Sequence, residues 1–517
     1  MKNPQLVSSV VFAVIGWLVY KLINIGRRDK TLPPGPPTAP LVGNAHLLPS
    51  KFAFLKFSEW GRQYGGIFSI KLANATMIVV SDMKVVKELL DDRSSETSSR
   101  PFSFAVHSIS KGYFALTSSD NPLWKASRKS IQPFLSAGAI QSHVSISDKE
   151  TTQLLYDILN TPEYLRNFVK TVSPESAPVD LIPILRYIPE SIAPWGKVWR
   201  ETRQQQQSIY YFFFEHTLRE VNAGNKKGTI IEAIVKNQEE LGLTQDAIAY
   251  IGGMLLDAGS ETSATTIQSL ILSLLKFPAC LKKAQEEIDE LIGDSRLPIS
   301  TDIDELPYVQ AVIKEGHRLR PAVPCGIPHA ALNDCHYRGY TIPKGSPILI
   351  NIWGILHDPG ESCIVFLVIG ILRIGSHTAG ADRSLTKVLK CRSAPAVSEL
   401  FDRPDEFRPE RYLETPDGTI PGLKKDFNIR LNLPFGSGKR LCPGMNFSNI
   451  FLNLAVMRLL WAFDFTPYDD LTTNHDTWDI EKEYSEGITL TPKNLRCKIT
   501  PRNEKRARII QNSYKEA

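Results

Sequence analysis

One stretch of the chain, residues 433–444, combines a cysteine with glycines and two cations. Three glycines would let the backbone approach a flat ligand closely: Gly436, Gly438 and Gly444. Arg440 and Lys439 would put positive charge beside the sulfur of Cys442. Such charge favours the thiolate, the form of cysteine that binds a metal. We therefore predict that Cys442 is a metal ligand.

The residues after this loop predict a helix. Pro443 could be its first residue, because proline at that position loses no hydrogen bond, and the sequence is then apolar from Phe447 to Phe463. The sulfur of Cys442 would lie near the helix N-terminus, where the partial positive charge favours an anion. The alternative is that Cys442 is a small buried apolar side chain, as most free cysteines are.

The order F-x-x-G-x-R-x-C-x-G is filled at every fixed position, by Phe435, Gly438, Arg440, Cys442 and Gly444. This loop resembles the haem-binding loop of the cytochrome P-450 family. The resemblance implies a fold that is mainly α with a smaller β part. It also implies haem b as the cofactor, with the thiolate of Cys442 as the axial ligand of the iron and the other four residues in contact with the cofactor.

A second stretch, residues 249–277, predicts a long apolar helix with a polar middle, AGSET. Polar groups in a core are costly unless they are paired, and hydroxyls with a carboxylate can locally open the hydrogen-bond ladder of a helix. One interpretation is a kinked core helix with satisfied polar groups. The segment also resembles the family's [AG]Gx[DE]T motif, which implies that Glu261 and Thr262 are catalytic and deliver protons on the distal side of the iron.

A third stretch, residues 308–321, predicts a helix in which Glu315 and Arg318 share one face and can pair. Such pairs are usually solvated and contribute little. Here they match the family's ExxR motif, and Arg411 in FRPERY is the expected third member of a buried network. The resemblance implies that this network is structural support for the cysteine loop.

Trp124 and Arg128 are four residues apart and share one face of a predicted helix. Spacing alone favours a surface cation stacked on an indole ring. The family's WxxxR pattern implies instead that both contact a haem propionate. His329 is either an ordinary core or surface histidine or, by the same resemblance, a further propionate contact.

Four other segments carry simpler expectations. Residues 66–81 alternate as strands of a half-buried sheet do. The resemblance implies that a loop from Ser99 to about Tyr113 covers the substrate pocket. Residues 487–500 alternate like a hairpin that reaches into the pocket, and residues 502–517 resemble a solvated tail.

Composition excludes several classes of protein. The chain has 517 residues and a net charge of +5, from 60 Lys and Arg against 55 Asp and Glu. This mild charge gives no nucleic-acid footprint, so no nucleic-acid partner is expected. The seven cysteines are irregularly spaced and include no CxxC pair, which argues against a disulfide framework and a structural zinc site. The catalytic part is therefore expected to face a reducing compartment.

Residues 6–25 are predominantly apolar and match the length of a bilayer span, about 20 residues. More cations follow this stretch than precede it, so the positive-inside rule predicts a cytosolic body. A cleaved signal peptide is the alternative, but the stretch is long and no small-residue cleavage site follows it. We predict a single-pass anchor at residues 1–30 in the endoplasmic reticulum membrane, in lipid contact through residues 6–25, followed by a haem-thiolate domain over residues 31–517.

Two places depart from the family's pattern. Residues 360–398 separate HDP from ELFDRPDEF, which the family joins directly, and they carry a short apolar run followed by basic and small residues. We predict a foreign insertion from a misdrawn gene boundary or an unspliced intron; a genuine surface loop is the alternative. The interval between Trp124 and Thr262 is also shorter than the family's. A helix that covers the long one would be missing, so we expect poor folding or weak haem binding.

The resemblance implies a monooxygenase that inserts one oxygen atom from O2 into a small apolar organic substrate. The sequence contains no recognisable flavin or nicotinamide site, so electrons are expected from an NADPH-dependent reductase. Fungal members that the body resembles suggest secondary metabolism. Two alternatives remain open, a peroxygenase or isomerase on the same fold and an inactive relative or haem carrier. The apolar pocket positions do not distinguish between substrates: Phe102 to Phe114, Pro321 to Ile327 and Ile488.

Overall fold

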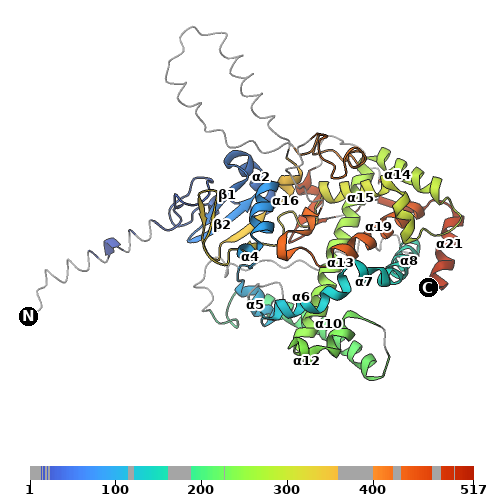
Figure 1. Cartoon of the computed structure of the whole chain (residues 1–517), viewed down its shortest axis with the longest axis horizontal. Coiled ribbons are helices and arrows are strands. Elements are labelled where there is room, and N and C mark those ends of the chain that lie inside the picture. The colour runs from blue at the N-terminus through green and yellow to red at the C-terminus, as the bar shows by residue number, and fades with distance from the viewer. Residues whose placement is uncertain are drawn as a thin grey trace, which may run out of the picture.

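The structure is a computed structural model of the chain. It describes residues 13, 15–17, 20, 24–114, 122–160, 188–225, 228–358, 400–422, 432–467, 479–493, 495 and 497–516. Helices dominate these residues, and the strands form a smaller part (Figure 1). This confirms the expected fold class, mainly α with a smaller β part. The predicted insertion at 360–398 and most of the predicted anchor lie outside the described residues.

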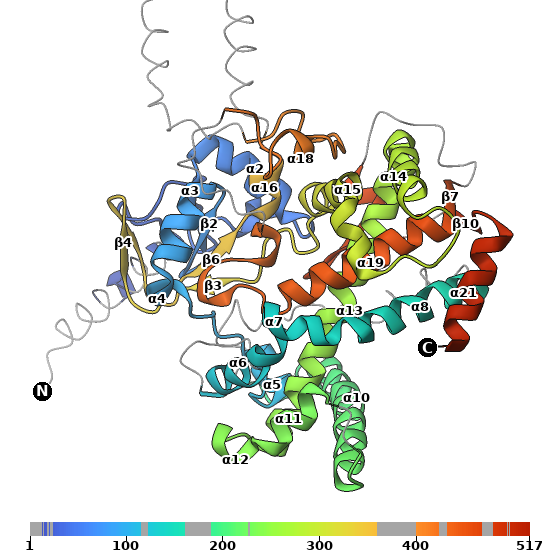
Figure 2. The same ribbon diagram turned by 45° about the vertical axis from the view of Figure 1, so that its right-hand side comes forward.

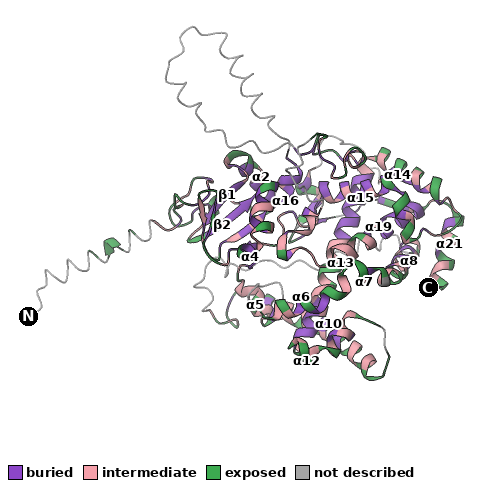
Figure 3. Cartoon of the chain, in the orientation of Figure 1, coloured by how far each residue is buried: buried purple, intermediate pink, exposed green. Residues whose placement is uncertain are grey.

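The long helix α13 (Gln245–Lys276) passes through the middle of the molecule, between α10 (Gly196–Asn222) on one side and the helices that form the main core on the other (Figure 2). Its C-terminal half packs against α15 (Pro307–Leu319) and α19 (Met445–Ala462). Buried apolar side chains gather where these helices meet, as Figure 3 shows by colour. Two further helices, α8 (Val144–Asn160) and α14 (Pro278–Leu291), pack against α19.

The main sheet has the strand order β1-β2-β6-β3. The antiparallel pair β1 (Ile67–Leu72) and β2 (Ala75–Val80) confirms the strands expected at 66–81. β2 also pairs in parallel with β6 (Pro347–Ile350), which pairs antiparallel with β3 (His329–Ala330). Most of their apolar side chains are buried because α2 (Ala53–Tyr64) packs against the sheet.

Shorter elements connect these parts: η1 (Ala45–Leu47), α3 (Met83–Val86), η2 (Lys87–Asp92), α4 (Ser94–Thr97), α5 (Phe104–Ser110), α6 (Pro122–Leu135), α7 (Ala137–Ile140), η3 (Gln141–His143), α11 (Ile230–Lys236), α12 (Gln238–Leu241), η7 (Ser300–Glu305), β4 (Cys335–Tyr337), β5 (Tyr340–Ile342), α16 (Ile352–Leu356), α18 (Arg411–Glu414), η9 (Leu433–Phe435), η10 (Gly438–Arg440) and α20 (Ile480–Glu483). Helix α5 corrects the loop expected at 99–113, because Ser103 caps it by accepting a hydrogen bond from the N–H of Val106.

Helix α10 packs closely on α13, since a Cβ at Gly253 would lie within 2.1 Å of the Tyr210 ring. Five large apolar side chains on or beside α10 are exposed: Ile192, Val198, Ile209, Phe212 and Phe213. Residues 161–187, part of the interval from which a helix was predicted to be missing, lie outside the described residues. The absence of that helix therefore stays a prediction.

The C-terminal part corrects two expectations. The predicted hairpin at 487–500 is wrong, because β9 (Leu490–Pro492) pairs with β8 (Tyr484–Glu486) and β10 (Cys497–Pro501) pairs with β7 (Phe463–Pro467). The predicted tail is mostly a helix, α21 (Glu504–Glu516), in which Tyr514 stacks on Tyr156 of α8 at 3.8 Å between ring centroids. One apolar face with buried Ile510 explains the helix.

Within the described part of the chain, no single helix has the length and apolarity of a membrane span. Helices α13 and α14 satisfy the criterion only as a pair, and they are bent by 109° where they join.

Candidate active site

Cys442 lies in a tight loop between η10 and α19. The loop is closed by the N–H of Cys442, which donates to the carbonyl of Phe435 at 2.9 Å. Gly436 and Gly438 have φ values of +89° and +57°, in the left-handed region that side chains disfavour. The cysteine is half-buried. The backbone conformation therefore explains why glycine stands at two of the positions noted in the sequence.

The sulfur of Cys442 lies at the N-terminus of α19, as predicted, and the N–H groups of Gly444 and Met445 point toward it. Burial raises the pKa of the Cys442 thiol above its ordinary value, and these N–H groups and the Arg128 guanidinium oppose that rise. The predicted helix start at Pro443 is wrong by two residues, because Pro443 and Gly444 form a turn before Met445.

The predicted source of positive charge at the sulfur is also corrected. Arg128, on α6, is the cation that acts on Cys442, and its Nη2 donates to the carbonyl of Leu441 at 3.0 Å. Arg440 points elsewhere: its guanidinium lies 3.9 Å from the centroid of the Trp124 ring, and its Nε donates to the carbonyl of Ser98. Because the arginine side chain is long, Arg440 can reach away from Cys442, although the two residues are close in sequence.

Arg440 belongs to a buried cluster of basic groups with Arg100 and His329. Burial and the charge of Arg440 lower the pKa of Arg100 to about 9. Burial, Arg100 and Arg440 lower the pKa of His329 to about 3, against a hydrogen bond with the Thr97 carbonyl. Among the described residues, no carboxylate forms an ion pair with Arg100 or His329. The cluster therefore suits an anionic ligand group.

Glu315, Arg318 and Arg411 form the buried network that the sequence predicted. Arg318 donates from Nε and Nη2 to both oxygens of Glu315, at 2.7 and 2.9 Å. Oε1 of Glu315 also accepts from Nε of Arg411 at 3.2 Å and from the backbone N–H of Arg408 at 2.8 Å. The remaining guanidinium N–H groups of Arg318 bind the carbonyls of three residues: Leu356, Pro404 and Glu406. These bonds join α15 to the segment that leads to α18.

The polar middle of α13 does not interrupt the helix, which corrects the expectation of an opened ladder. The hydroxyls bond to carbonyls one turn back, Ser260 to Leu256 at 2.6 Å and Thr262 to Ala258 at 2.7 Å, and so add to the ladder. Glu261 turns to the β8–β9 turn, where its carboxylate accepts from the hydroxyl of Thr489. Neither Glu261 nor Thr262 forms a hydrogen bond to the cysteine loop among the described residues.

Two supports of the cysteine loop had no signal in the sequence. Asp91, at the end of the π-helical turn η2, accepts from the Ser437 hydroxyl and from the N–H of Gly438. His317, on α15, places its ring 5.5 Å from that of Phe435, and burial lowers the pKa of His317 to about 4. Arg100, which lies in the loop predicted from Ser99 to about Tyr113, was not predicted as a site residue.

These groups fit haem. One thiolate offers too few donors for a free metal ion, which takes four or more ligands, but it suffices for an iron already held by a porphyrin. The basic cluster offers partners for two carboxylates. Ala258 and Gly259, in the middle of α13, are exposed although the helix is buried at Ala247–Ile251 and at Ala264–Leu274, and a Cβ at Gly259 would meet no atom within 4 Å.

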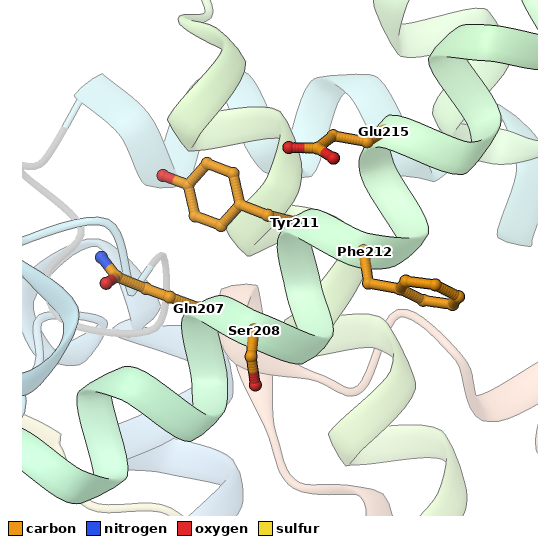
Figure 4. Close-up of a pocket in the computed structure, with 5 residues that line it drawn as sticks. All are labelled: Gln207, Ser208, Tyr211, Phe212 and Glu215. Carbon is orange, nitrogen blue, oxygen red and sulfur yellow. The ribbon is translucent and has the colours of Figure 1, made fainter.

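A separate hollow of about 550 Å³ lies on α10 (Figure 4). It is lined by five α10 side chains: Gln207, Ser208, Tyr211, Phe212 and Glu215. None of them is a residue that the sequence predicted for the site. In Figure 4 the Phe212 ring points away from the Tyr211 ring.

The fold and the cysteine loop together define a haem-thiolate protein. The family described as cytochrome P-450 matches residues 33–163, 156–361 and 396–499. The chain belongs to this family and is an oxidoreductase whose cofactor is haem with thiolate-ligated iron. The match does not include residues 362–395.

Curated relatives are similar over nearly their whole length. The chain is 30% identical to the cytochrome P-450 monooxygenase ple5B of Rhodocybe pseudopiperita, over 99% of this chain and 97% of that protein. It is 32% identical to a cytochrome P-450 monooxygenase of Armillaria gallica, over 97% and 95%. A zebra fish cytochrome P-450 solved with progesterone aligns with a TM-score of 0.62 at 24% identity, over 87% of this chain and 99% of that one, which confirms the fold.

Proposed function

We propose that this protein is a monooxygenase that inserts one oxygen atom from O2 into a small apolar organic substrate, and that the Cys442 thiolate would hold the haem iron. The observation that carries the proposal is the position of the Cys442 sulfur, at the N-terminus of α19 and beside Arg128. When bound, haem supplies the binding and activation of O2, and a thiolate ligand favours cleavage of the O–O bond.

Arg440, Trp124, Arg128 and His329 hold the propionates in this proposal, and Arg100 joins them. The positive charges of Arg440, Arg100 and Arg128 match two carboxylates, and Trp124 fixes the plane of the Arg440 guanidinium. Phe435, Gly438 and Gly444 shape the loop for the cofactor: the carbonyl of Phe435 accepts from the N–H of Cys442, Gly438 packs against Leu90, and Gly444 lies beside the sulfur. The buried network of Glu315, Arg318 and Arg411 keeps the supporting backbone in register.

Glu261 and Thr262 deliver protons in this proposal. A carboxylate can exchange a proton with solvent, and a hydroxyl can pass one on because it both donates and accepts. Both side chains are half-buried next to the exposed residues Ala258 and Gly259, so they border the uncovered part of α13. Thr262 can rotate its hydroxyl away from the Ala258 carbonyl at the cost of one neutral hydrogen bond.

The remaining partners follow from the sequence. Electrons come from an NADPH-dependent reductase, and the apolar residues 6–25 hold the chain in the endoplasmic reticulum membrane with its body in the cytosol. The similarity to monooxygenases of Rhodocybe pseudopiperita and Armillaria gallica supports the monooxygenase activity, and the role in secondary metabolism expected from the sequence stays part of the proposal. The exposed side chains of Phe102 and Ile488 support an apolar substrate.

The test is an isotope experiment on the full haem-loaded chain with reductase and NADPH. Fatty, aromatic, terpenoid and polyketide compounds are offered under ¹⁸O2, and the products are analysed by mass spectrometry. We expect one ¹⁸O atom in the product, and none when the label is in water. A product formed with hydrogen peroxide but not with NADPH and O2 would indicate a peroxygenase, and a rearranged product without label an isomerase.

Thr262→Val provides the residue-level check. Loss of the hydroxyl is expected to lower the amount of product per NADPH by about tenfold, since positioned proton transfer contributes at least that much. Thr466→Val is the control, because Thr466 is an exposed residue of β7 outside the proposed site. Equal loss in both variants would contradict the role of Thr262.

A further inference from the structure

A file of three threonine hydroxyls ends on the carboxylate of Glu261. Thr489, in the β8–β9 turn, donates to Oε1 of Glu261. The hydroxyls of Thr489 and Thr491 are 3.1 Å apart, and those of Thr491 and Thr265 are 3.0 Å apart. The file joins two elements, α13 and the β8–β9 hairpin, which lie more than 220 residues apart in the chain.

The direction of these hydrogen bonds follows from their chemistry. An ionised carboxylate only accepts, so the single proton of the Thr489 hydroxyl is used on Glu261. Thr489 must then accept from Thr491, and Thr491 must accept from Thr265. All three O–H dipoles therefore point along the file toward the carboxylate, and such chains are mutually strengthening.

Burial makes this arrangement costly unless the bonds are formed. Thr489, Thr491 and Thr265 are 5%, 6% and 0% exposed, and a buried hydroxyl without a partner costs about 1–3 kcal/mol. Thr265 also differs from its neighbour on the helix. Thr266 bonds back to the carbonyl of Thr262 on its own helix, whereas Thr265 reaches across to the hairpin.

A further contact holds the turn that carries Thr489. Ile488 is 64% exposed, and the N–H of Leu490 donates to the carbonyl of Ala322 at 2.8 Å, so the turn is tied to the segment after α15. A glutamate on a helix has three rotatable bonds and would otherwise move freely. Its bond to Thr489 fixes one carboxylate oxygen and leaves the second to face other groups.

We propose that Thr489 is a positioning residue for Glu261: it holds the carboxylate against the β8–β9 turn in the orientation from which Glu261 delivers protons, and Thr491 and Thr265 hold Thr489. The inference rests on the proposed role of Glu261 in proton delivery and adds the residues that position its carboxylate.

The first test measures the bond itself, without turnover. Hydrogen–deuterium exchange of the peptide at residues 484–492 is followed in the haem-loaded full chain. Thr489→Val and Glu261→Ala are each expected to speed exchange of the turn about tenfold, because each removes a hydrogen bond to a charged group. The double variant should add nothing further, since both changes break the same bond. Unchanged exchange in Thr489→Val would overturn the proposal.

The second test measures proton delivery with reductase, NADPH and O2, with no added substrate. The readouts are hydrogen peroxide formed per NADPH oxidised and the ratio of rates in H2O and D2O. Thr489→Val should alter both by at least about threefold, a modest part of what a positioned acid contributes. Thr489→Ser should restore wild-type values because it keeps the hydroxyl, and Thr265→Val should show a smaller change of the same sign.

Thr266→Val is the matched control, because Thr266 is 6% exposed on α13 and its hydroxyl bonds, among the described residues, to a carbonyl of the same helix. A faster-exchanging turn with unchanged peroxide yield and isotope ratio would make Thr489 merely structural and overturn the proposal. If Thr489→Val binds no haem, the proposal is tested with Thr265→Val and Thr489→Ser, by the same peroxide yield and isotope ratio. Failure of the wild-type chain to consume NADPH would refute the proposed function instead, while the exchange result would still report on the bond.

Discussion

Gly438 packs directly against the backbone carbonyl of Leu90, so closely that a Cβ at Gly438 would stand 2.1 Å from that oxygen. Its φ of +57° is a second reason for glycine. The contact joins the cysteine loop to the turn η2, whose Asp91 also accepts the N–H of Gly438 at 2.7 Å. The loop that carries Cys442 is thus held against a neighbouring element by its backbone.

Gly438→Ala is therefore expected to destabilise the folded protein by at least about 2 kcal/mol, because the added Cβ would overlap a backbone oxygen, which cannot rotate away as the end of a side chain can. Gly224→Ala is the control: Gly224 has a φ of +81°, but a Cβ there would meet no atom within 4 Å. That variant should lose about 1 kcal/mol or less. Urea unfolding of both variants measures the difference, and equal losses would contradict the close contact.

Removing the charge of Glu315 should be more damaging. Glu315→Gln leaves Arg318 and Arg411 buried without their carboxylate, and breaking a buried ion pair in this way costs about 3–5 kcal/mol. We expect little haem-loaded protein, measured as the ratio of Soret to protein absorbance after purification. Glu286→Gln breaks an exposed pair with Lys282 and should leave that ratio unchanged. A normal ratio in Glu315→Gln would contradict the supporting role.

His317 should make stability depend on pH. Its pKa is about 4 in the folded protein and near 6.5 when unfolded, so the unfolded chain binds the extra proton between these values. The contribution of His317 to the free energy of unfolding is complete above pH 6.5 and is lost as the pH falls toward 4. In His317→Leu the loss of unfolding free energy from pH 7 to 4.5 should shrink by up to about 2 kcal/mol. The exposed His46→Leu is the control, and an unchanged loss in His317→Leu would contradict the burial of the ring.

The predicted insertion can be tested by deleting residues 360–398. The described residues nearest to this segment, Asp358 before it and Leu400 after it, are both buried. We expect the shortened chain to bind haem at least as well as the full one, by the same absorbance ratio. Loss of haem on deletion would identify the segment as a genuine part of the fold, as would a transcript that carries its codons in frame.

The sequence predicted most of the site because the relevant contacts are local or carried by short motifs. Glu315 and Arg318 are three residues apart on one helix, and the sulfur of Cys442 follows from the start of α19. Contacts between distant segments escaped it. Nothing in the sequence pairs Asp91 with Gly438 or Thr489 with Glu261, since side-chain hydrogen bonds across such separations leave no periodic pattern.

Errors of the sequence-based account have the same origin. Arg440 is close to Cys442 in sequence, yet its guanidinium stacks on Trp124, and Arg128 from α6 supplies the charge at the sulfur. The predicted hairpin at 487–500 failed because strands of three to five residues do not reveal their partners. Alternation along one strand says which face is buried, not which strand lies beside it.

The central claim is that Cys442 is the thiolate ligand of haem, and the carbon monoxide difference spectrum of the reduced protein tests it most directly. Cys280→Ser is the control, since Cys280 is also half-buried. We expect the red-shifted Soret band of a thiolate complex in the wild-type chain and in Cys280→Ser, and its absence in Cys442→Ser. A red-shifted band that persists in Cys442→Ser would contradict the account.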